Sequence, residues 1–292
     1  MLTAELKTPP TKLMIYTFTN PFCIWCWASE PMLRKIEVEF GEHVEIYPYI
    51  GSLIPDLRVI QDPESGLYAY DIERSNKNFI ERWQRHASEI GMPIDVVGLE
   101  LFNERRYSTM PTEVALEAAR LANETLFPMY LRRIREALFT EQVPVNEQDE
   151  YLRLAEEVGY DLDSFTEPLI NGRARSYFYE GLQTAEKYGV DTYPTSILVW
   201  QDDEREEAIF LKSFVTFSAY ADAIDKLSHG QTKAHPLPPT VQSVHELSKR
   251  YSCLATREIA EILNLEDSEA ETLALEARLK RKAIHTSAFF YR

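Results

Sequence analysis

The feature that most constrains the fold is a pair of cysteines placed directly after a buried strand. The segment Lys12–Phe18 is short, apolar and rich in branched and aromatic side chains, which is typical of a strand buried on both faces. Asn20-Pro21 interrupts it, and apolar residues at helical spacing then run from Cys23 to Phe40. Alternating side chains in Val44–Tyr49 predict a second strand. The amino-terminal part therefore predicts a β–α–β unit with Cys23 and Cys26 at the start of its helix.

The stretch that follows is mostly helical until the next strand-like run, Ser196–Trp200. We expect Glu207–Phe214 to complete a hairpin with that strand through the acidic turn Gln201–Arg205. We expect Ser218–His229 to be the last helix of this part. The helices predicted between the strands are Phe79–Ile90, Pro111–Ala122, Leu126–Leu138, a helix from the possible cap Asn146 to Gly159, and Ser176–Tyr188.

A small carboxy-terminal unit follows the proline-rich segment Gly230–Thr240, which reads as a linker. Gln242–Tyr251 and Thr256–Leu263 are expected to be short amphipathic helices. A third helix is expected to open at Ser268 with Glu271 completing a capping box, and strand-like Lys282–Tyr291 closes the chain. Three helices and a terminal strand or hairpin indicate a winged-helix shape.

Composition narrows the classes of function. The chain has 292 residues, 31 lysines and arginines against 47 acids, and a formal net charge of -16. This balance argues against broad binding of nucleic acids or anionic membranes. Met1–Lys12 shows no signal-peptide pattern, the apolar runs are too short to cross a bilayer, and three cysteines form no disulfide framework. The expectation is a cytoplasmic protein, where a C-x-x-C pair is transient, catalytic or metal-binding.

The pair Cys23-Ile24-Trp25-Cys26 has the residues that thiol–disulfide exchange requires. The reaction needs a thiolate and a second thiol that resolves the mixed disulfide. At a helix start, Cys23 would lie near unpaired N–H groups and the positive end of the helix dipole. We therefore expect Cys23 to attack and Cys26, one turn inside, to be more shielded and less acidic.

Two other uses of the cysteines, in a zinc site or in a purely structural role, are less favoured. A zinc site needs a further Cys or His pair, whereas Cys253 stands alone and the histidines form no i, i+3 or i, i+4 pair. We favour redox chemistry and predict no metal and no cofactor. A purely structural role for both cysteines is less favoured still, because they directly follow the turn that ends a strand.

A second signal is the segment Thr192-Tyr193-Pro194, which lies between a helix end and an apolar strand. Proline is disfavoured inside a central strand. A cis bond before Pro194 would place the backbone of Thr192 and Tyr193 beside the cysteines, where it could hold an extended substrate chain. A strand-initiating proline is the plain alternative.

Together these residues resemble the DsbA-like thioredoxin superfamily, and are most similar to the FrnE-type cytosolic oxidoreductases and the YjbH/SpxH-type adaptor proteins of bacteria. The resemblance covers roughly residues 12 to 230. It implies a nucleophilic first cysteine, Cys23, and a cis proline, Pro194. Asn20 departs from the Asp found in many members. The motifs that carry the resemblance are Asn20–Trp27, Glu30-Pro31, Ala115–Ala122, Ala137–Phe139, Leu152–Gly159, Tyr188–Val190 and Tyr193–Thr195.

The fold class predicted is therefore α/β, a thioredoxin fold with an inserted helical domain and a small winged-helix-like unit. The predicted division is residues 1–60 and 185–230 for the two thioredoxin-like parts, 61–184 for the inserted helical domain, 231–240 for the linker and 241–292 for the carboxy-terminal module.

Several neighbouring side chains have competing interpretations. We expect Trp25 to line an exposed apolar groove for substrates and Trp27 to be core. Tyr193 could shape the substrate loop or merely pack. For Glu30 a solvated helix carboxylate is favoured over a proton acceptor for Cys26, and for Cys253 a buried apolar role is favoured over a redox role.

The carboxy-terminal unit has balanced charge, with a local basic cluster at Arg278–Lys282. We therefore favour packing, homodimerisation or partner docking over DNA binding.

The functional hypotheses are a protein dithiol–disulfide oxidoreductase or isomerase, supplied with electrons by glutathione or a thioredoxin system, and a non-enzymatic, redox-sensitive adaptor that presents a client to a partner. A redox-sensing DNA regulator and a glutathione-dependent transferase or isomerase are minor alternatives.

Overall fold

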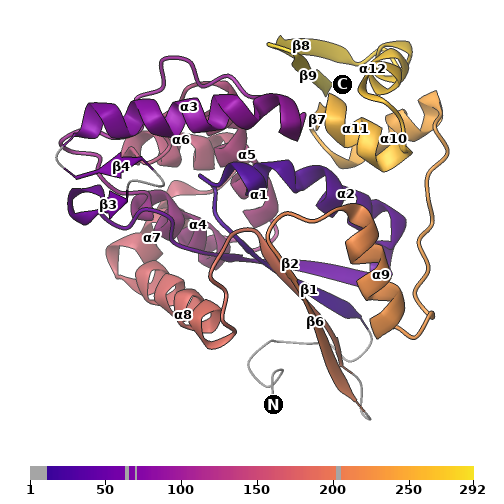
Figure 1. The fold of residues 1–292 in the computed structure, drawn as a ribbon, viewed down its shortest axis with the longest axis horizontal. Coiled ribbons are helices and arrows are strands. Elements are labelled where there is room, and N and C mark those ends of the chain that lie inside the picture. Colours follow the sequence, from indigo (N-terminus) through magenta and orange to yellow (C-terminus); the bar gives the residue numbers. More distant parts are fainter. Residues whose placement is uncertain (1–11, 63–65, 70, 202–204) are drawn as a thin grey trace.

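A central sheet organises the computed structural model, which describes residues 12–62, 66–69, 71–201 and 205–292. The four strands are β1 (Leu13–Thr19), β2 (Val44–Ile50), β5 (Thr195–Gln201) and β6 (Glu206–Lys212), in the order β2-β1-β5-β6 (Figure 1). β1 runs parallel to β2 and antiparallel to β5, and β6 pairs antiparallel with β5. The predicted strand Glu207–Phe214 thus ends earlier, at Lys212, and positions 202–204 of the predicted acidic turn lie outside the described residues.

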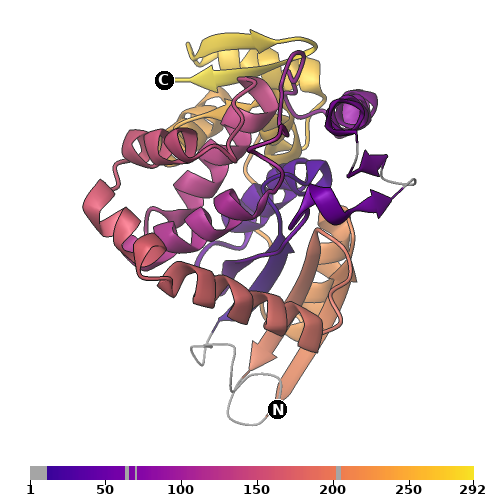
Figure 2. The ribbon, with the colours of Figure 1, turned by 90° about the vertical axis from the view of Figure 1, so that its left-hand side faces the viewer.

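Alternate residues of β1 face opposite layers of helices. Leu13 and Ile15 pack with α2 (Glu30–Glu39) and α9 (Phe217–Leu227). Met14, Tyr16 and Phe18 face the other side, where α8 (Arg173–Lys187) contributes Ala185. Figure 2 shows α8 crossing in front of the strands. The central strand is therefore buried on both faces, as its continuous apolar sequence predicts.

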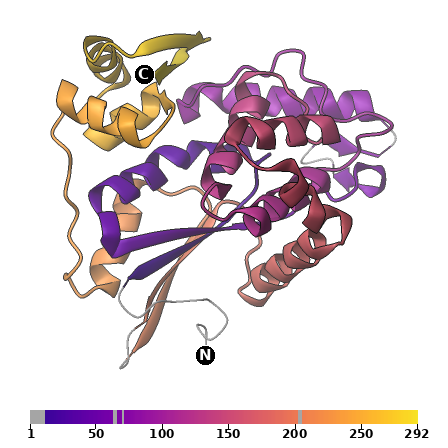
Figure 3. The same cartoon turned by 180° about the vertical axis from the view of Figure 1, so that it is seen from behind.

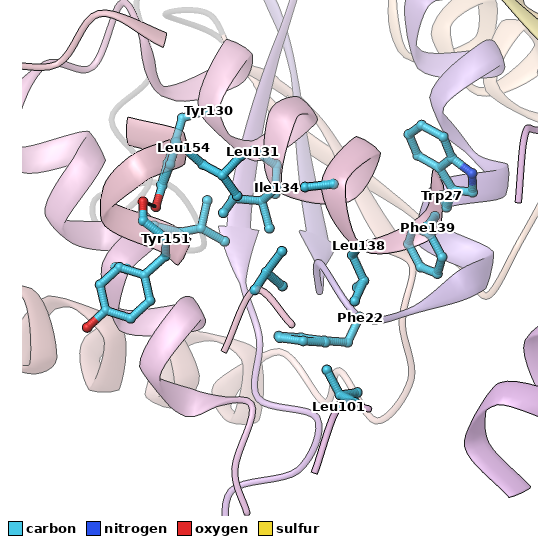
Figure 4. Close-up of a cluster of buried hydrophobic side chains, with 14 of the residues drawn as sticks. Phe22, Trp27, Leu101, Tyr130, Leu131, Ile134, Leu138, Phe139, Tyr151 and Leu154 are labelled. Carbon is cyan, nitrogen blue, oxygen red and sulfur yellow. Dashed lines mark hydrogen bonds between the residues drawn. The ribbon is translucent and has the colours of Figure 1, made fainter. Parts of the chain in front are cut away.

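The segment between β2 and β5 is mostly helical. Its helices are α3 (Ile72–Ile90), α4 (Met110–Ala122), α5 (Phe127–Thr140), α6 (Gln148–Val158), α7 (Leu162–Ile170) and α8. A 3-10 turn at Leu57–Val59 and a short β3–β4 ladder (Gln61–Asp62 with Leu67–Tyr68) come before them, and another 3-10 turn, Gly41–His43, precedes β2. Figure 3 shows these helices gathered at one end of the sheet. Figure 4 shows their core, in which Leu131, Ile134 and Leu138 of α5 lie with Phe22 and Leu101.

Three helix predictions need correction. α3 begins seven residues before Phe79, because the side chain of Asp71 accepts a hydrogen bond from the backbone N–H of Arg74 and caps the helix there. α7 was not predicted, since Pro168 lies inside it. Asn146 does not cap α6; its buried amide instead donates hydrogen bonds to Leu101 and Ser108 carbonyls at 3.0 and 3.1 Å.

The carboxy-terminal unit contains α10 (Val241–Arg250), β7 (Leu254–Ala255), α11 (Thr256–Leu263), α12 (Asp267–Glu276), β8 (Lys280–Ile284) and β9 (Ser287–Tyr291). The strands form an antiparallel sheet in the order β7-β9-β8, so helices and hairpin have the arrangement of a winged helix. The predicted capping box lies two residues earlier than expected, because Glu269 accepts the hydrogen bond from the backbone N–H of Glu266.

This unit packs on the rest of the molecule, with α11 lying along α2 (Figure 1). Cys253, Ile284 and Phe289 belong to the same buried cluster as Trp27. The segment before α10 also makes contact, since the backbone N–H of His235 donates to the Glu39 carbonyl at 2.7 Å. Among the described residues no helix is long and apolar enough to span a membrane. The mixed α/β fold predicted from the sequence is confirmed.

Candidate functional site

The two cysteines lie where β1 turns into the first short helix, α1 (Ile24–Ala28). Cys23 is the N-cap residue with an extended backbone, and its carbonyl accepts hydrogen bonds from the N–H groups of Cys26 and Trp27 at 3.0 and 3.1 Å. Both thiols are free; Cys23 is half-buried and Cys26 is fully buried. Cys23 is therefore the more exposed of the two cysteines.

The loop before β5 lies against the Cys23 sulfur. The Tyr193–Pro194 bond is cis, and the Cys23 thiol donates a hydrogen bond to the Tyr193 carbonyl at 3.4 Å. Residues separated by 170 positions in the chain thus meet at one sulfur atom. The Thr192 carbonyl turns instead toward its own loop, where it accepts a hydrogen bond from the Thr195 hydroxyl at 2.9 Å. The structure brings Cys23, Cys26, Tyr193 and Pro194 together.

The acidities of the two thiols differ from the expectation. The hydrogen bond to Cys26, together with burial, raises the pKa of Cys23. Burial disfavours a charge on Cys26, but the hydrogen bond from Cys23, the positive charge of Arg135 and a hydrogen bond with Thr19 lower the pKa of Cys26. These directions run against the prediction that Cys26 is the less acidic thiol. Arg135, which α5 brings to the site from far along the chain, is one of the groups that lower the pKa of Cys26.

Glu30 is also not the solvated carboxylate that the sequence suggested. Its side chain is 14% exposed and forms ion pairs with Arg132 at 3.3 Å and with Arg135. Burial opposes its charge, but the guanidinium groups of Arg135, Arg132 and Arg34 lower the pKa of Glu30. A carboxylate held ionised in this way is a counter-ion rather than a proton acceptor for Cys26.

Trp25 lies at the surface beside Cys23 and contacts two aromatic side chains from distant segments. Its ring centroid is 5.0 Å from that of His86 on α3 and 5.7 Å from that of Phe214 after β6. Phe214 is 38% exposed. Trp27, in contrast, is fully buried, stacks on Phe139 and donates a hydrogen bond to the Pro93 carbonyl, so its predicted core role is confirmed (Figure 4).

A buried polar cluster lies behind the cis-proline loop and was missed by sequence reasoning. Glu113 on α4 has one carboxylate oxygen that accepts hydrogen bonds from the Asn20 amide at 2.7 Å, the Thr109 hydroxyl at 2.8 Å and the Leu53 N–H at 3.0 Å. Its other oxygen is buried without a partner. Burial raises the pKa of Glu113 to about 7, against the effect of these hydrogen bonds. Asn20, the departure from the family pattern, thus connects the site to a titrating carboxyl group.

Tyr193 fixes the loop through a close approach to Gly51. A Cβ atom built on Gly51 would lie 2.1 Å from the Tyr193 ring. Burial, together with the nearby charges of Glu113 and Cys26, raises the pKa of Tyr193 to about 12, so its hydroxyl stays neutral. Packing of the Tyr193 ring thus holds the loop in place.

Two other features lie away from the dithiol. Cys253 is buried, and burial together with the charge of Glu136 raises the pKa of Cys253 to about 12, which suits the apolar role predicted for it. A cavity of about 590 Å³ opens in the inserted helices, lined by residues such as Arg105, Tyr151 and Arg175. In the part of the chain that the structure describes, no group of three or more His, Cys, Asp or Glu side chains could hold a metal ion.

Curated relatives match nearly the whole chain. The ClpXP adapter protein SpxH of Halalkalibacterium halodurans is 26% identical over 270 residues, which cover 92% of this chain and 84% of the relative. The SpxH protein of Shouchella clausii is 28% identical over the same shares. That of Bacillus subtilis is 24% identical over 90% of this chain and 82% of the relative. Each of these alignments covers at least 90% of this chain, so each includes part of the carboxy-terminal unit.

Solved structures share the fold at low sequence identity. A protein described as a disulfide isomerase from Nitrosomonas europaea gives a TM-score of 0.60 at 17% identity, covering 75% of this chain and 99% of that chain. The cytosolic disulfide reductase DsbM from Pseudomonas aeruginosa gives 0.50 at 17% identity, covering 74% and 95%. A family model described as thioredoxin matches residues 16–222. The protein therefore belongs to the thioredoxin family and has the fold of its DsbA-like members.

Proposed function

We propose that this protein exchanges disulfides with partner proteins through Cys23 and Cys26. The observation that carries the proposal is the Cys23 thiol, which lies one turn from Cys26 and is hydrogen-bonded to the carbonyl just before the cis proline. An extended chain that pairs with the Tyr193 backbone would bring its own disulfide to this sulfur. Trp25, His86 and Phe214 would then contact the apolar side chains that flank the substrate cysteine.

We assign a role to each thiol. Cys23 attacks a substrate disulfide, and its proton passes to the ionised form of Cys26, whose pKa the neighbouring Cys23, Arg135 and Thr19 lower. One substrate sulfur joins Cys23, and the other leaves as a thiolate. Cys26 then attacks the mixed disulfide and its proton passes to the leaving sulfur. The products are a Cys23–Cys26 disulfide and a reduced substrate, and the reverse sequence oxidises a substrate.

The test is catalysis of insulin disulfide reduction with glutathione as the electron donor. Cys23→Ser and Cys26→Ser are expected to lose the rate enhancement, because each removes one of the two sulfurs. Cys253→Ala is the matched control and is expected to keep it, since Cys253 is buried away from the pair. An unchanged rate in Cys23→Ser would contradict the proposal.

The second candidate is an adaptor that presents a client protein to the ClpXP protease. Full-length similarity to proteins named ClpXP adapter protein SpxH supports it. This candidate predicts that the double variant Cys23→Ser/Cys26→Ser still binds a client and still promotes its degradation by purified ClpXP. Absence of a client for both the native protein and the double variant would count against it. The cytoplasm is the compartment we propose for either role, in keeping with the DsbM relative described as cytosolic.

A further inference from the structure

A chain of alternating buried charges connects Cys26 to the carboxy-terminal unit. Its members are Arg135, Glu30, Arg132 and Glu258, taken from α5, α2, α5 again and α11. Buried charges are costly unless each is paired, and each member of this series has an oppositely charged neighbour. This series of charges joins the candidate dithiol to a separate structural unit.

At the first end, Arg135 faces the dithiol. Its side chain is 3% exposed, and one terminal nitrogen donates a hydrogen bond to the Thr19 hydroxyl at 2.5 Å. Thr19 in turn forms a hydrogen bond with Cys26, and the charge of Arg135 favours the anionic form of that sulfur. The Nε atom of Arg135 is buried without a hydrogen-bond partner. Arg135 is therefore shared between Glu30 and the sulfur of Cys26.

At the other end, Glu258 holds α11 against the thioredoxin-like part. It is fully buried and accepts two hydrogen bonds from Arg132, at 2.6 and 3.1 Å. Arg34 on α2 donates to Glu258 at 2.8 Å and also to the Cys253 carbonyl at 2.9 Å. Arg132 reaches Glu30 as well, at 3.3 Å, so this guanidinium is shared between the site and the docked unit.

The reduced pair has a thiol that can ionise near Arg135, whereas the disulfide has none, so the redox state changes the charge that this end of the series can carry. When Cys26 is ionised it draws on Arg135, which leaves Glu30 more dependent on Arg132 and Glu258 less well paired. Closing the Cys23–Cys26 disulfide removes the negative charge, so Arg135 pairs with Glu30 alone and Arg132 is freed for Glu258. Direct repulsion between the thiolate and Glu258 acts in the same direction.

We propose that oxidation of the Cys23–Cys26 pair tightens the docking of the carboxy-terminal unit through Arg135, Glu30, Arg132 and Glu258. The coupling is reciprocal, so docking in turn favours the disulfide. Arg135 is the positioning residue of this device. The proposal rests on the proposed function in one respect, which is that the two cysteines form a disulfide.

The direct test is hydrogen exchange of the full-length native protein in its two redox states. Oxidised glutathione takes two electrons from the pair and becomes two molecules of reduced glutathione, with one proton supplied by Cys23 and the other by solvent when Cys26 is ionised. Intact mass measured in acid, where both free thiols are protonated, confirms the loss of two hydrogens. We expect backbone amides of Thr256–Leu263 and Ser287–Tyr291 to exchange about fivefold more slowly in the oxidised protein, at the low end of measured coupling between sites. Equal exchange in the two states would overturn the proposal without any variant.

Variants then identify the path. Arg135→Gln is expected to abolish the difference, and to shift the equilibrium with glutathione about tenfold, or about 30 mV, toward the disulfide, because the reduced form loses its counter-ion. Arg135→Lys keeps the charge and is expected to restore most of that equilibrium. Arg133→Gln on the same helix is the matched control, since Arg133 pairs with Glu141 and Glu157 outside the chain of charges.

The outcomes separate the two proposals. If oxidised glutathione does not close the disulfide, the proposed function fails. If the disulfide closes and Arg135→Gln keeps the native difference in exchange, only the coupling through Arg135 fails.

Discussion

Two buried carboxyl groups near the dithiol differ in charge because their neighbours differ. Glu30 lies among arginines, which lower its pKa and keep it ionised. Glu113 is surrounded by neutral donors, and burial raises its pKa to about 7. Both residues are glutamates, so the presence or absence of neighbouring positive charge decides whether the carboxyl group is ionised.

The raised pKa of Glu113 predicts a specific pH dependence of stability. Between pH 4.5 and 7 the carboxyl is ionised in the unfolded chain but still protonated in the folded one, so the free energy of unfolding falls as pH rises. The loss is complete above about pH 7 and amounts to roughly 3 kcal/mol for a shift of this size. Glu113→Gln mimics the neutral acid and lacks this loss.

Urea unfolding of the native protein and of Glu113→Gln from pH 4.5 to 8 measures the effect as a difference. Contributions from other titrating groups cancel in that difference. We expect the variant to gain stability relative to the native protein across this range. Parallel curves would show that Glu113 is ionised throughout or is not buried as described.

The residues that sequence analysis identified are those whose signal is local. Cys23 and Cys26 form a recognisable motif at a helix start, and Pro194 lies in a recognisable dipeptide before a strand. Arg135 and Glu113 carry no such signal. Arg135 lies on α5 and Glu113 on α4, and neither belongs to a recognisable motif. Their roles depend on how those helices pack against β1, which spacing along one chain does not specify.

At the scale of elements, the loop before β5 is held by its contact with the residue that follows β2. The Tyr193 ring occupies the space that a side chain on Gly51 would need. The Tyr193 carbonyl in turn accepts the hydrogen bond from Cys23. Packing between two loops therefore sets the distance between the Tyr193 backbone and the Cys23 sulfur.

Gly51→Ala is expected to displace Tyr193 and to destabilise the protein by about 1–3 kcal/mol, as added volume does in packed sites. The rate of disulfide exchange should fall as well, because the loop moves away from Cys23. Gly181→Ala is the matched control: its added Cβ meets Tyr49 at 3.8 Å, an ordinary contact, and it lies inside α8. That variant should gain about 0.5–1 kcal/mol. Thermal unfolding and insulin reduction measure both effects, and equal behaviour of the two variants would refute this account of the loop.

The elements that the sequence predicted well are those with strong periodicity and clear caps. α4, α5 and α11 lie within two residues of their expected bounds at either end. Helices with weaker periodicity were harder to predict from the sequence. α7 contains a proline, and α3 starts at a cap that precedes its apolar pattern. Tertiary packing stabilises such helices where local propensity alone does not predict them.

At the scale of the whole molecule, the carboxy-terminal unit is part of the same packed structure as the dithiol. Two members of its local basic cluster have acidic neighbours: Arg281 pairs with Glu271 at 2.7 Å, and Lys282 lies 3.9 Å from Glu141. These pairs, with the net charge of -16, support docking over DNA reading.

The central claim is that Cys23 is the sulfur through which the protein reacts. Exposing the reduced single variants Cys26→Ala and Cys23→Ala to oxidised glutathione, followed by peptide mass spectrometry, tests it directly. We predict a glutathione mixed disulfide on Cys23 in the first variant and none on Cys26 in the second, because Cys26 has no exposed surface. Modification of Cys26 in Cys23→Ala, or no modification of Cys23 in Cys26→Ala, would contradict the account.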